Sequence, residues 1–188
     1  MANKTTVALT LEQYKEIINT MRSGGAGFRK NDRIATVLVL EANLGIRIED
    51  VLKLRLSSFL KDGSNYRLNI VETKTNKDRT FIVPVPVYQF VYIYCLENNI
   101  GKNDVMFPIT TRAVQKHLKK VADYLGYEYI GTHSFRKFFA SDMYEKNDYD
   151  IELVRELLQH SSTATTRRYI RRSSVRIEEA ISNHVYLL

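Results

Sequence analysis

The sequence predicts a mainly α-helical fold with one small antiparallel β-sheet, which places it in the α+β class. Most of the chain consists of apolar segments with helical spacing, and glycines, prolines or capping residues stand at their ends. Only residues 66–72 and 79–85 are strand-like runs, and the polar turn between them is typical of a β-hairpin. The 188 residues are 44% hydrophobic and 26% charged, which is ordinary globular usage and suits one domain.

The first part of the chain is predicted to form three helices. Thr10, with a glutamine three residues later, has the capping-box pattern and starts a helix that runs to about Arg22. A second apolar helix follows over residues 32–44, and Gly45 stands at its C-terminal stop. A short helix is expected over residues 48–54.

The part of the chain beyond the hairpin is also predicted to be helical. Pro84 and Pro86 close the hairpin, and Pro86 suits the first turn of a helix that runs to about residue 98. Asp150 is a suitable N-cap residue for a later helix. The remaining helices are expected at residues 111–125, 132–146, 150–159, 163–170 and 174–183.

Composition excludes several classes of protein. Cys95 is the single cysteine, so an intramolecular disulfide and a Cys-rich metal site are both excluded. No apolar run approaches the roughly 18 residues that span a bilayer, and the N-terminus lacks the apolar block of a signal peptide. We therefore expect a cytoplasmic protein without membrane contact. The net charge of +7 and the pI of about 9.4 favour a polyanionic partner, most often nucleic acid.

Two cations in the first half of the chain are candidate functional residues. Arg47 follows Gly45 and begins a predicted helix, where the macrodipole favours acids over cations. A bound anion would make an arginine favourable there, and Asp50 can hold its guanidinium; the alternative is a surface ion pair of little energetic value. Lys74 lies at the predicted hairpin tip, where a lysine taken alone is usually just solvated.

Four candidates lie in the second half. His133 and Arg136 are three residues apart on a predicted helix, so they share a face and can grip a phosphate diester together. His160 ends a helix, where the dipole favours its protonated form. Tyr169 follows nine residues later within a basic run. Taken singly, these residues also fit a capping histidine, a surface arginine and a packed aromatic ring.

The order Arg, Lys, His-x-x-Arg, His, Tyr along the chain resembles the catalytic domain of the tyrosine recombinases, the phage-integrase family. Arg47 with Asp50 matches the family's arginine and the acid three residues after it. Residues 73–79, Thr-Lys-Thr-Asn-Lys-Asp-Arg, are similar to the family's hairpin turn, in which Lys74 matches the catalytic lysine and Lys77 is its rival.

The later motifs extend this resemblance to roughly residues 8–180. His133 and Arg136 match the family's His-x-x-Arg, and Tyr169 matches its nucleophile. The segment Leu158-Gln159-His160-Ser161 is similar to Leu-Gly-His-Ser, with Gln159 in place of glycine. Leu44, where the family often has threonine, is a second departure. Neither departure removes a reactive group.

The resemblance implies DNA strand transfer through a 3′-phosphotyrosine intermediate, without metal, ATP or other cofactor. Tyr169 would attack the phosphodiester, and Arg47, Arg136 and His160 would bind its non-bridging oxygens. Lys74 would protonate the departing 5′-oxygen, and His133 would help to remove the tyrosine proton. The alternatives are a type IB topoisomerase-like enzyme that nicks and reseals one duplex, and a catalytically idle DNA-binding module.

The resemblance also implies domain organisation and partners. Residues 1–188 are expected to form one catalytic domain, with a core at about 8–172 and a tail at 173–188. The tail is expected to dock on a neighbouring protomer in the DNA-bound assembly, and the alternative, favoured for the free fragment, is that it packs on its own domain. The family's N-terminal core-binding domain is expected to be absent. The expected partner is double-stranded DNA, on which the full-length protein forms a tetramer, whereas the free fragment is a monomer. The protein is expected to be encoded by a bacterium, phage or mobile element and to act in integration or excision. Expected DNA-binding cations are Lys77, Arg79, Arg112, Lys116, Lys119, Lys120, Lys137, Arg167 and Arg168.

Overall fold

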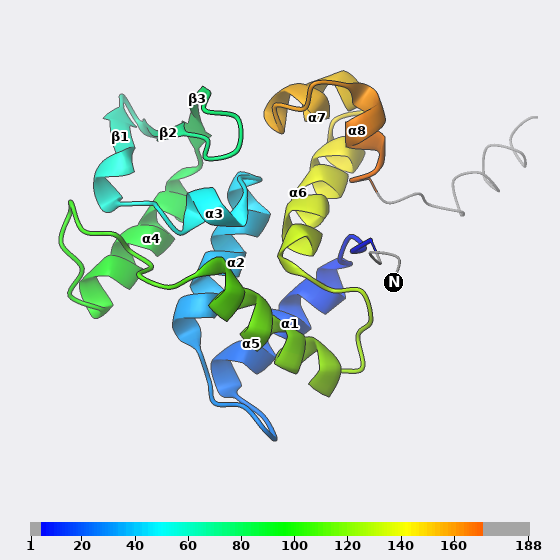
Figure 1. Cartoon of the computed structure of the whole chain (residues 1–188). Coiled ribbons are helices and arrows are strands. Elements are labelled where there is room, and N and C mark those ends of the chain that lie inside the picture. The colour runs from blue at the N-terminus through cyan, green and yellow to red at the C-terminus, as the bar shows by residue number, and fades with distance from the viewer. Residues whose placement is uncertain (1–4, 171–188) are drawn as a thin grey trace, which may run out of the picture.

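The computed structural model describes residues 5–170 of the chain, so the expected helix 174–183 and the docking tail lie outside the described residues. Helix α2 (Asp32–Leu44) packs against α1 (Leu11–Ser23) and α6 (Thr132–Lys146), and α1 packs in turn against α5 (Thr111–Tyr124). Figure 1 shows α1, α2 and α5 in the lower part of the molecule, the sheet above them on one side, and α6 rising on the other side to the short helices α7 and α8. The predicted class, mainly helical with a small antiparallel sheet, is confirmed.

Local signals in the sequence set the ends of the first helices. The Thr10 hydroxyl accepts a hydrogen bond from the Gln13 backbone N–H at 3.1 Å, and the Gln13 side chain accepts one from the Thr10 N–H at 3.0 Å. This is the predicted capping box. Asn31 caps α2 through its side-chain oxygen, and Gly45 ends α2 in the left-handed conformation, with φ of +58°. Both predicted helix boundaries of α2 are therefore confirmed.

The core is built from the apolar faces of these helices. Val114, Leu118 and Val121 are spaced four and three residues apart on α5 and are all buried, whereas the opposite face of α5 carries exposed cations. Leu38 of α2 and Phe135 of α6 are completely buried in the same core. Phe135 precedes Arg136, so the packing that fixes α6 also fixes the backbone of a predicted site residue.

The sheet has three antiparallel strands, one more than predicted. Strands β2 (Asn65–Val71) and β3 (Asp78–Val83) form the expected hairpin, and β1 (Phe59–Asp62) pairs with the other edge of β2. β1 has four residues and buries only Phe59, so it lacks the alternation that marks a strand. The two-residue loop Gly63-Ser64 that joins it to β2, with φ of +60° at the glycine, is the turn signal that could have revealed it.

The remaining helices are shorter than predicted or shifted by a residue. Helix α3 (Ile48–Val51) ends before residue 54, α7 (Ile151–Leu157) ends before residue 159, and α8 (Thr163–Arg167) ends before residue 170. Helix α4 (Val85–Glu97) has Pro86 in its first turn, as predicted, and ends one residue before the expected residue 98. Within the described residues no helix combines the length and apolar character needed to cross a membrane.

The end of α7 explains one departure from the family pattern. Gln159 follows α7 with φ of +52°, in the left-handed region that favours glycine. The usual glycine of Leu-Gly-His-Ser therefore matches the backbone here, and Gln159 adopts that backbone at a cost of about 1 kcal/mol. His160 follows directly after this residue, and its ring lies against that of Tyr169.

Candidate active site

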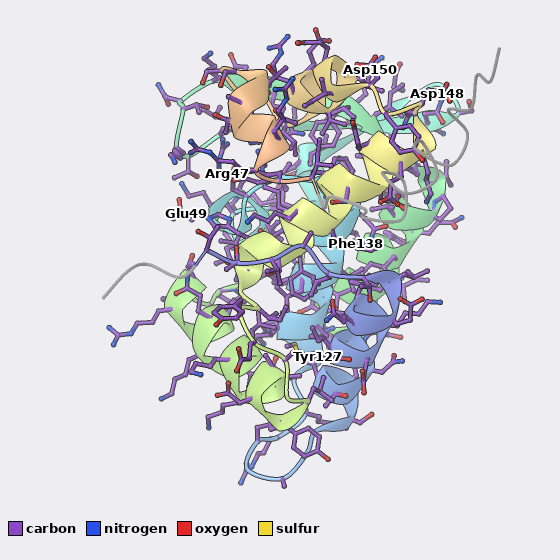
Figure 2. All side chains as sticks on the ribbon, turned by 90° about the vertical axis from the view of Figure 1, so that its right-hand side faces the viewer. Arg47, Glu49, Tyr127, Phe138, Asp148 and Asp150 are labelled. Atoms are coloured by element: carbon purple, nitrogen blue, oxygen red, sulfur yellow. The ribbon has the colours of Figure 1, made fainter. Side chains whose placement is uncertain are left out.

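Arg47 lies at the junction of α2 and α3 and is held by a carboxylate from the hairpin. It occupies the N-cap position of α3, and in Figure 2 it lies just below α8. Its Nη1 donates to Glu72 Oε2 at 2.5 Å, and 15% of the Arg47 side chain is exposed while Glu72 is completely buried. The pair leaves part of the guanidinium open to a ligand, since an arginine has five N–H donors.

Arg136 lies at the centre of the site and is completely buried. Its Nη1 donates to the Gly45 carbonyl at 2.6 Å and its Nη2 to the Leu158 carbonyl at 2.8 Å, which aims the guanidinium between α2 and α7. Burial, with repulsion from Arg47 and Arg79, lowers the pKa of Arg136 to about 10. The residue is still a cation at neutral pH.

His160 and Tyr169 lie against each other. Their ring centroids are 4.6 Å apart at an interplanar angle of 62°, and the Nδ1 of His160 lies 3.1 Å from the Thr166 hydroxyl. The negative charge of an ionised Tyr169 would be felt by Arg136, whose pKa it raises. The predicted nucleophile, histidine and arginine are therefore neighbours, although they come from three separate segments.

The prediction that His160 is protonated is wrong. Burial, with repulsion from Arg136 and Arg47, lowers the pKa of His160 to about 4. These positive charges come from other segments and outweigh the weak dipole of α7, which has only seven residues. At neutral pH His160 is a neutral imidazole that donates through one nitrogen and accepts through the other.

His133 and Lys74 complete the group. His133 lies in the first turn of α6, and Lys74 lies exposed in the turn between β2 and β3. Partial burial lowers the pKa of His133, and the charges of Arg136 and Lys137 lower it further. Lys74 and Arg47 act on the ring in the same direction, so the fold surrounds His133 with cations. A neutral His133 is able to accept a proton.

Asp50 has a different partner from the one expected. It was predicted to hold Arg47, but its Oδ1 accepts a hydrogen bond from the Thr73 backbone N–H at 2.8 Å. Asp50 is 2% exposed, so it anchors the start of the Lys74 turn from the protein interior. Glu72 takes the place beside Arg47 instead.

Two of the cations expected on DNA are buried. Arg79 is 5% exposed; it donates to Glu72 Oε1 at 3.3 Å and to the Leu157 carbonyl. Lys137 is 6% exposed and donates to the Thr6 carbonyl. These two side chains stabilise the fold around the site and have no free charge to offer an exposed phosphate. The other expected cations are exposed: Lys77, Arg112, Lys116, Lys119, Lys120, Arg167 and Arg168.

A hollow of about 570 Å³ connects the site with α5. Lys119 and His133 both line it, together with Thr6 and Tyr129. The exposed cationic face of α5 is thus continuous with the edge of the site at His133. Among residues 5–170 no three His, Cys, Asp or Glu side chains gather into a group that could hold a metal ion.

Glu72 is the site residue that sequence reasoning missed. In the hairpin, Leu68 and Glu72 are both buried and lie four residues apart, as alternation on one strand face requires. An acid on the inner face of a predicted strand indicates a buried cationic partner, because an unpaired buried charge is costly. This pattern was readable in the sequence, but it does not say which arginines are the partners.

Comparison with known proteins assigns the chain to a family. The sequence profile described as the phage integrase family matches residues 8–176. The chain belongs to the phage integrase family. The probable integrase/recombinase YoeC of Bacillus subtilis is 32% identical over 149 residues, which cover 75% of this chain and 78% of YoeC.

Solved structures show the same fold in this family. The XerH site-specific recombinase bound to palindromic difH substrate, a post-cleavage complex, superposes with a TM-score of 0.76 at 22% identity, covering 97% of this chain and 54% of that one. The catalytic domain of bacteriophage HP1 integrase superposes with a TM-score of 0.64 at 16% identity, and 95% of each chain is covered. The chain thus spans about half the length of XerH and almost all of the HP1 integrase catalytic domain.

Proposed function

We propose that this chain cleaves and rejoins DNA as the catalytic domain of a site-specific tyrosine recombinase, in the integration or excision of a mobile element. The observation that carries the proposal is the packing of Tyr169 on His160 next to Arg136. A phenol needs an electropositive site to attack phosphorus, because its ordinary pKa is near 10. The six predicted residues provide such a site.

The proposal assigns one group to each step of the reaction. The Tyr169 oxygen forms a bond to phosphorus as the bond from phosphorus to the 5′-oxygen breaks, and neutral His133 accepts the phenol proton. Arg47 and Arg136 stabilise the charge on the non-bridging oxygens, and neutral His160 adds a hydrogen bond. Lys74 gives its proton to the leaving 5′-oxygen. Attack by a 5′-hydroxyl of another strand reverses these steps and needs no energy source.

Access to Arg136 is part of this proposal. Two of its five N–H donors are used by carbonyls, which leaves three for a phosphate. Because the side chain is completely buried, bound DNA must displace the groups that cover it. Lys77, the exposed face of α5, Arg167 and Arg168 are proposed to hold the flanking duplex through its phosphates.

The partners of the reaction belong to the same proposal. We infer a duplex DNA substrate, a tetramer of full-length chains on DNA and a monomer for the isolated domain, acting in the bacterial cytoplasm where the DNA is. A tetramer follows from the chemistry, because each exchange of two duplexes breaks four strands and each chain has one nucleophile.

A pool of nicked suicide duplexes with a randomised core tests the function. Wild-type chain should trap a subset of the pool as a covalent adduct that survives denaturation, and sequencing the trapped DNA gives the target. Tyr169→Phe should form no adduct yet shift the same DNA in a gel. Tyr92→Phe is the matched control, since Tyr92 is 43% exposed on α4 and its loss removes only a surface hydroxyl.

Three results would overturn parts of the proposal. An adduct with Tyr169→Phe would show that another residue is the nucleophile. Binding without any adduct from wild-type chain would indicate an idle DNA-binding module. Relaxation of supercoiled plasmid that lacks the trapped sequence would indicate a topoisomerase-like enzyme that does not exchange strands.

A further inference from the structure

The Glu72 carboxylate gathers three donors inside the protein. Oε2 accepts from Arg47 Nη1 at 2.5 Å and from the Thr75 hydroxyl at 2.9 Å, and Oε1 accepts from Arg79 Nη1 at 3.3 Å. Burial alone would raise the pKa of Glu72, but the hydrogen bonds from Arg47 and Thr75 outweigh it and lower the pKa. The side chain is therefore ionised at neutral pH although it is completely buried.

One oxygen atom thus joins two parts of the site. Thr75 follows Lys74 directly in the turn, so the bond from Thr75 to Oε2 ties the Lys74 turn to the atom that holds Arg47. On the other side of Lys74, the Thr73 N–H donates to Asp50. Lys74 itself is exposed, but both of its neighbours are tethered to buried carboxylates.

The backbone closes the turn around the same residue. The Glu72 N–H donates to the Lys77 carbonyl and the Asn76 N–H donates to the Glu72 carbonyl, each at 2.9 Å. Asn76 has φ of +51°, so the turn has a defined shape. The position of the Lys74 backbone relative to Arg47 is then set by three bonds to Glu72, two from the main chain and one from Thr75, together with the bond from Thr73 to Asp50.

We propose that Glu72 and Thr75 are positioning residues, which hold the Lys74 turn at a fixed distance from Arg47 so that both act on the same phosphodiester. This inference rests on the proposed function, in which Arg47 binds the non-bridging oxygens and Lys74 protonates the leaving oxygen. Glu72 serves both residues, whereas Thr75 serves only the lysine. The two positions should therefore fail in different ways.

The decisive experiment changes the leaving group. Cleavage by single turnover is measured on the trapped suicide duplex and on the same duplex with a 5′-bridging sulfur, whose thiolate leaves without a proton. Thr75→Val removes the hydroxyl and should slow the oxygen substrate about tenfold, the value of one hydrogen bond to a charged group. It should cleave the sulfur substrate at the wild-type rate. Thr75→Ser keeps the hydroxyl and should match wild type on both.

Glu72→Gln tests whether Glu72 positions Arg47 as well as the Lys74 turn. The amide keeps the volume and one acceptor oxygen but loses the charge that Arg47 and Arg79 face. This variant should slow both substrates at least tenfold, because a sulfur leaving group cannot replace a misplaced Arg47. Gel shift should show duplex binding within about twofold of wild type, since exposed cations supply most of it. A cooperative thermal melt shows whether Glu72→Gln is folded; if it is not, the Thr75 pair still decides.

Lys74→Ala separates failure of this inference from failure of the proposed function. If sulfur rescues Lys74→Ala but not Thr75→Val, the lysine is the acid and the positioning role is overturned. If sulfur rescues neither, the general-acid role fails and the positioning proposal fails with it. A wild-type rate for Glu72→Gln on the oxygen substrate, or full rescue of this variant by the sulfur substrate, would overturn the proposal that Glu72 positions Arg47.

Discussion

Replacing Gly45 by alanine should damage both the stability of the fold and the active site. Gly45 ends α2 with φ of +58°, and a left-handed backbone costs an alanine about 1–2 kcal/mol. A Cβ built there lies 2.3 Å from Cδ1 of Phe139, so the ring must move, which costs about 1–3 kcal/mol more. The sum, about 2–5 kcal/mol, corresponds to a fall in Tm of about 10 °C for a domain of this size.

Thermal unfolding followed by circular dichroism measures this loss, and Gly126→Ala is the matched control. Gly126 also has a positive φ, +72°, but a Cβ there meets nothing within 4 Å, so it should lose only the backbone share. Equal losses for the two variants would refute the clash. Gly45→Ala should also slow cleavage well below its Tm, because the Gly45 carbonyl holds Arg136.

Two further predictions concern a pKa and a helix cap. Because the pKa of His160 falls from about 6.5 in the unfolded chain to about 4 in the folded one, its stabilising contribution is complete above pH 6.5 and is lost as the pH falls towards 4. Urea unfolding should show that the unfolding free energy of wild type falls by about 2 kcal/mol between pH 7 and 5 through this group, a loss that His160→Gln lacks. The same pH dependence of the unfolding free energy in both proteins would contradict this. Thr10→Ala should cost about 1 kcal/mol of unfolding free energy by losing the cap of α1, whereas Thr10→Ser should cost much less; equal losses would show that the hydroxyl does not stabilise the helix.

Much of the fold was predictable because its signals are local. The capping box at Thr10, the stop at Gly45 and the cap at Asp150 are short-range patterns, and each appears in the structure as predicted. Strand β1 was missed because three of its four residues are exposed and show no alternation. Its existence depends on pairing with β2, which supplies the hydrogen bonds that the sequence of β1 does not indicate.

The candidate site shows the same division between local and long-range causes. The six residues carry recognisable groups, so their order along the chain was enough to propose them. Burial of Arg79 and Lys137 was not predictable, because their acceptors lie 78 and 131 residues away in sequence. The charge state of His160 was predicted wrongly for the same reason. The helix-dipole argument considers only α7, whereas the charges that lower the pKa of His160 are those of Arg136 and Arg47, which come from other segments.

The end of α7 links the two halves of the site, which has a practical consequence for engineering. The Leu157 carbonyl accepts from Arg79 and the next carbonyl, that of Leu158, accepts from Arg136. Two adjacent carbonyl groups therefore hold both arginines, one from the hairpin and one from α6. The exposed cations of α5 make none of these bonds, so changing them should leave both arginines in place. Insertions or deletions at residues 157–160 would shift both arginines together and should be kept out of any library.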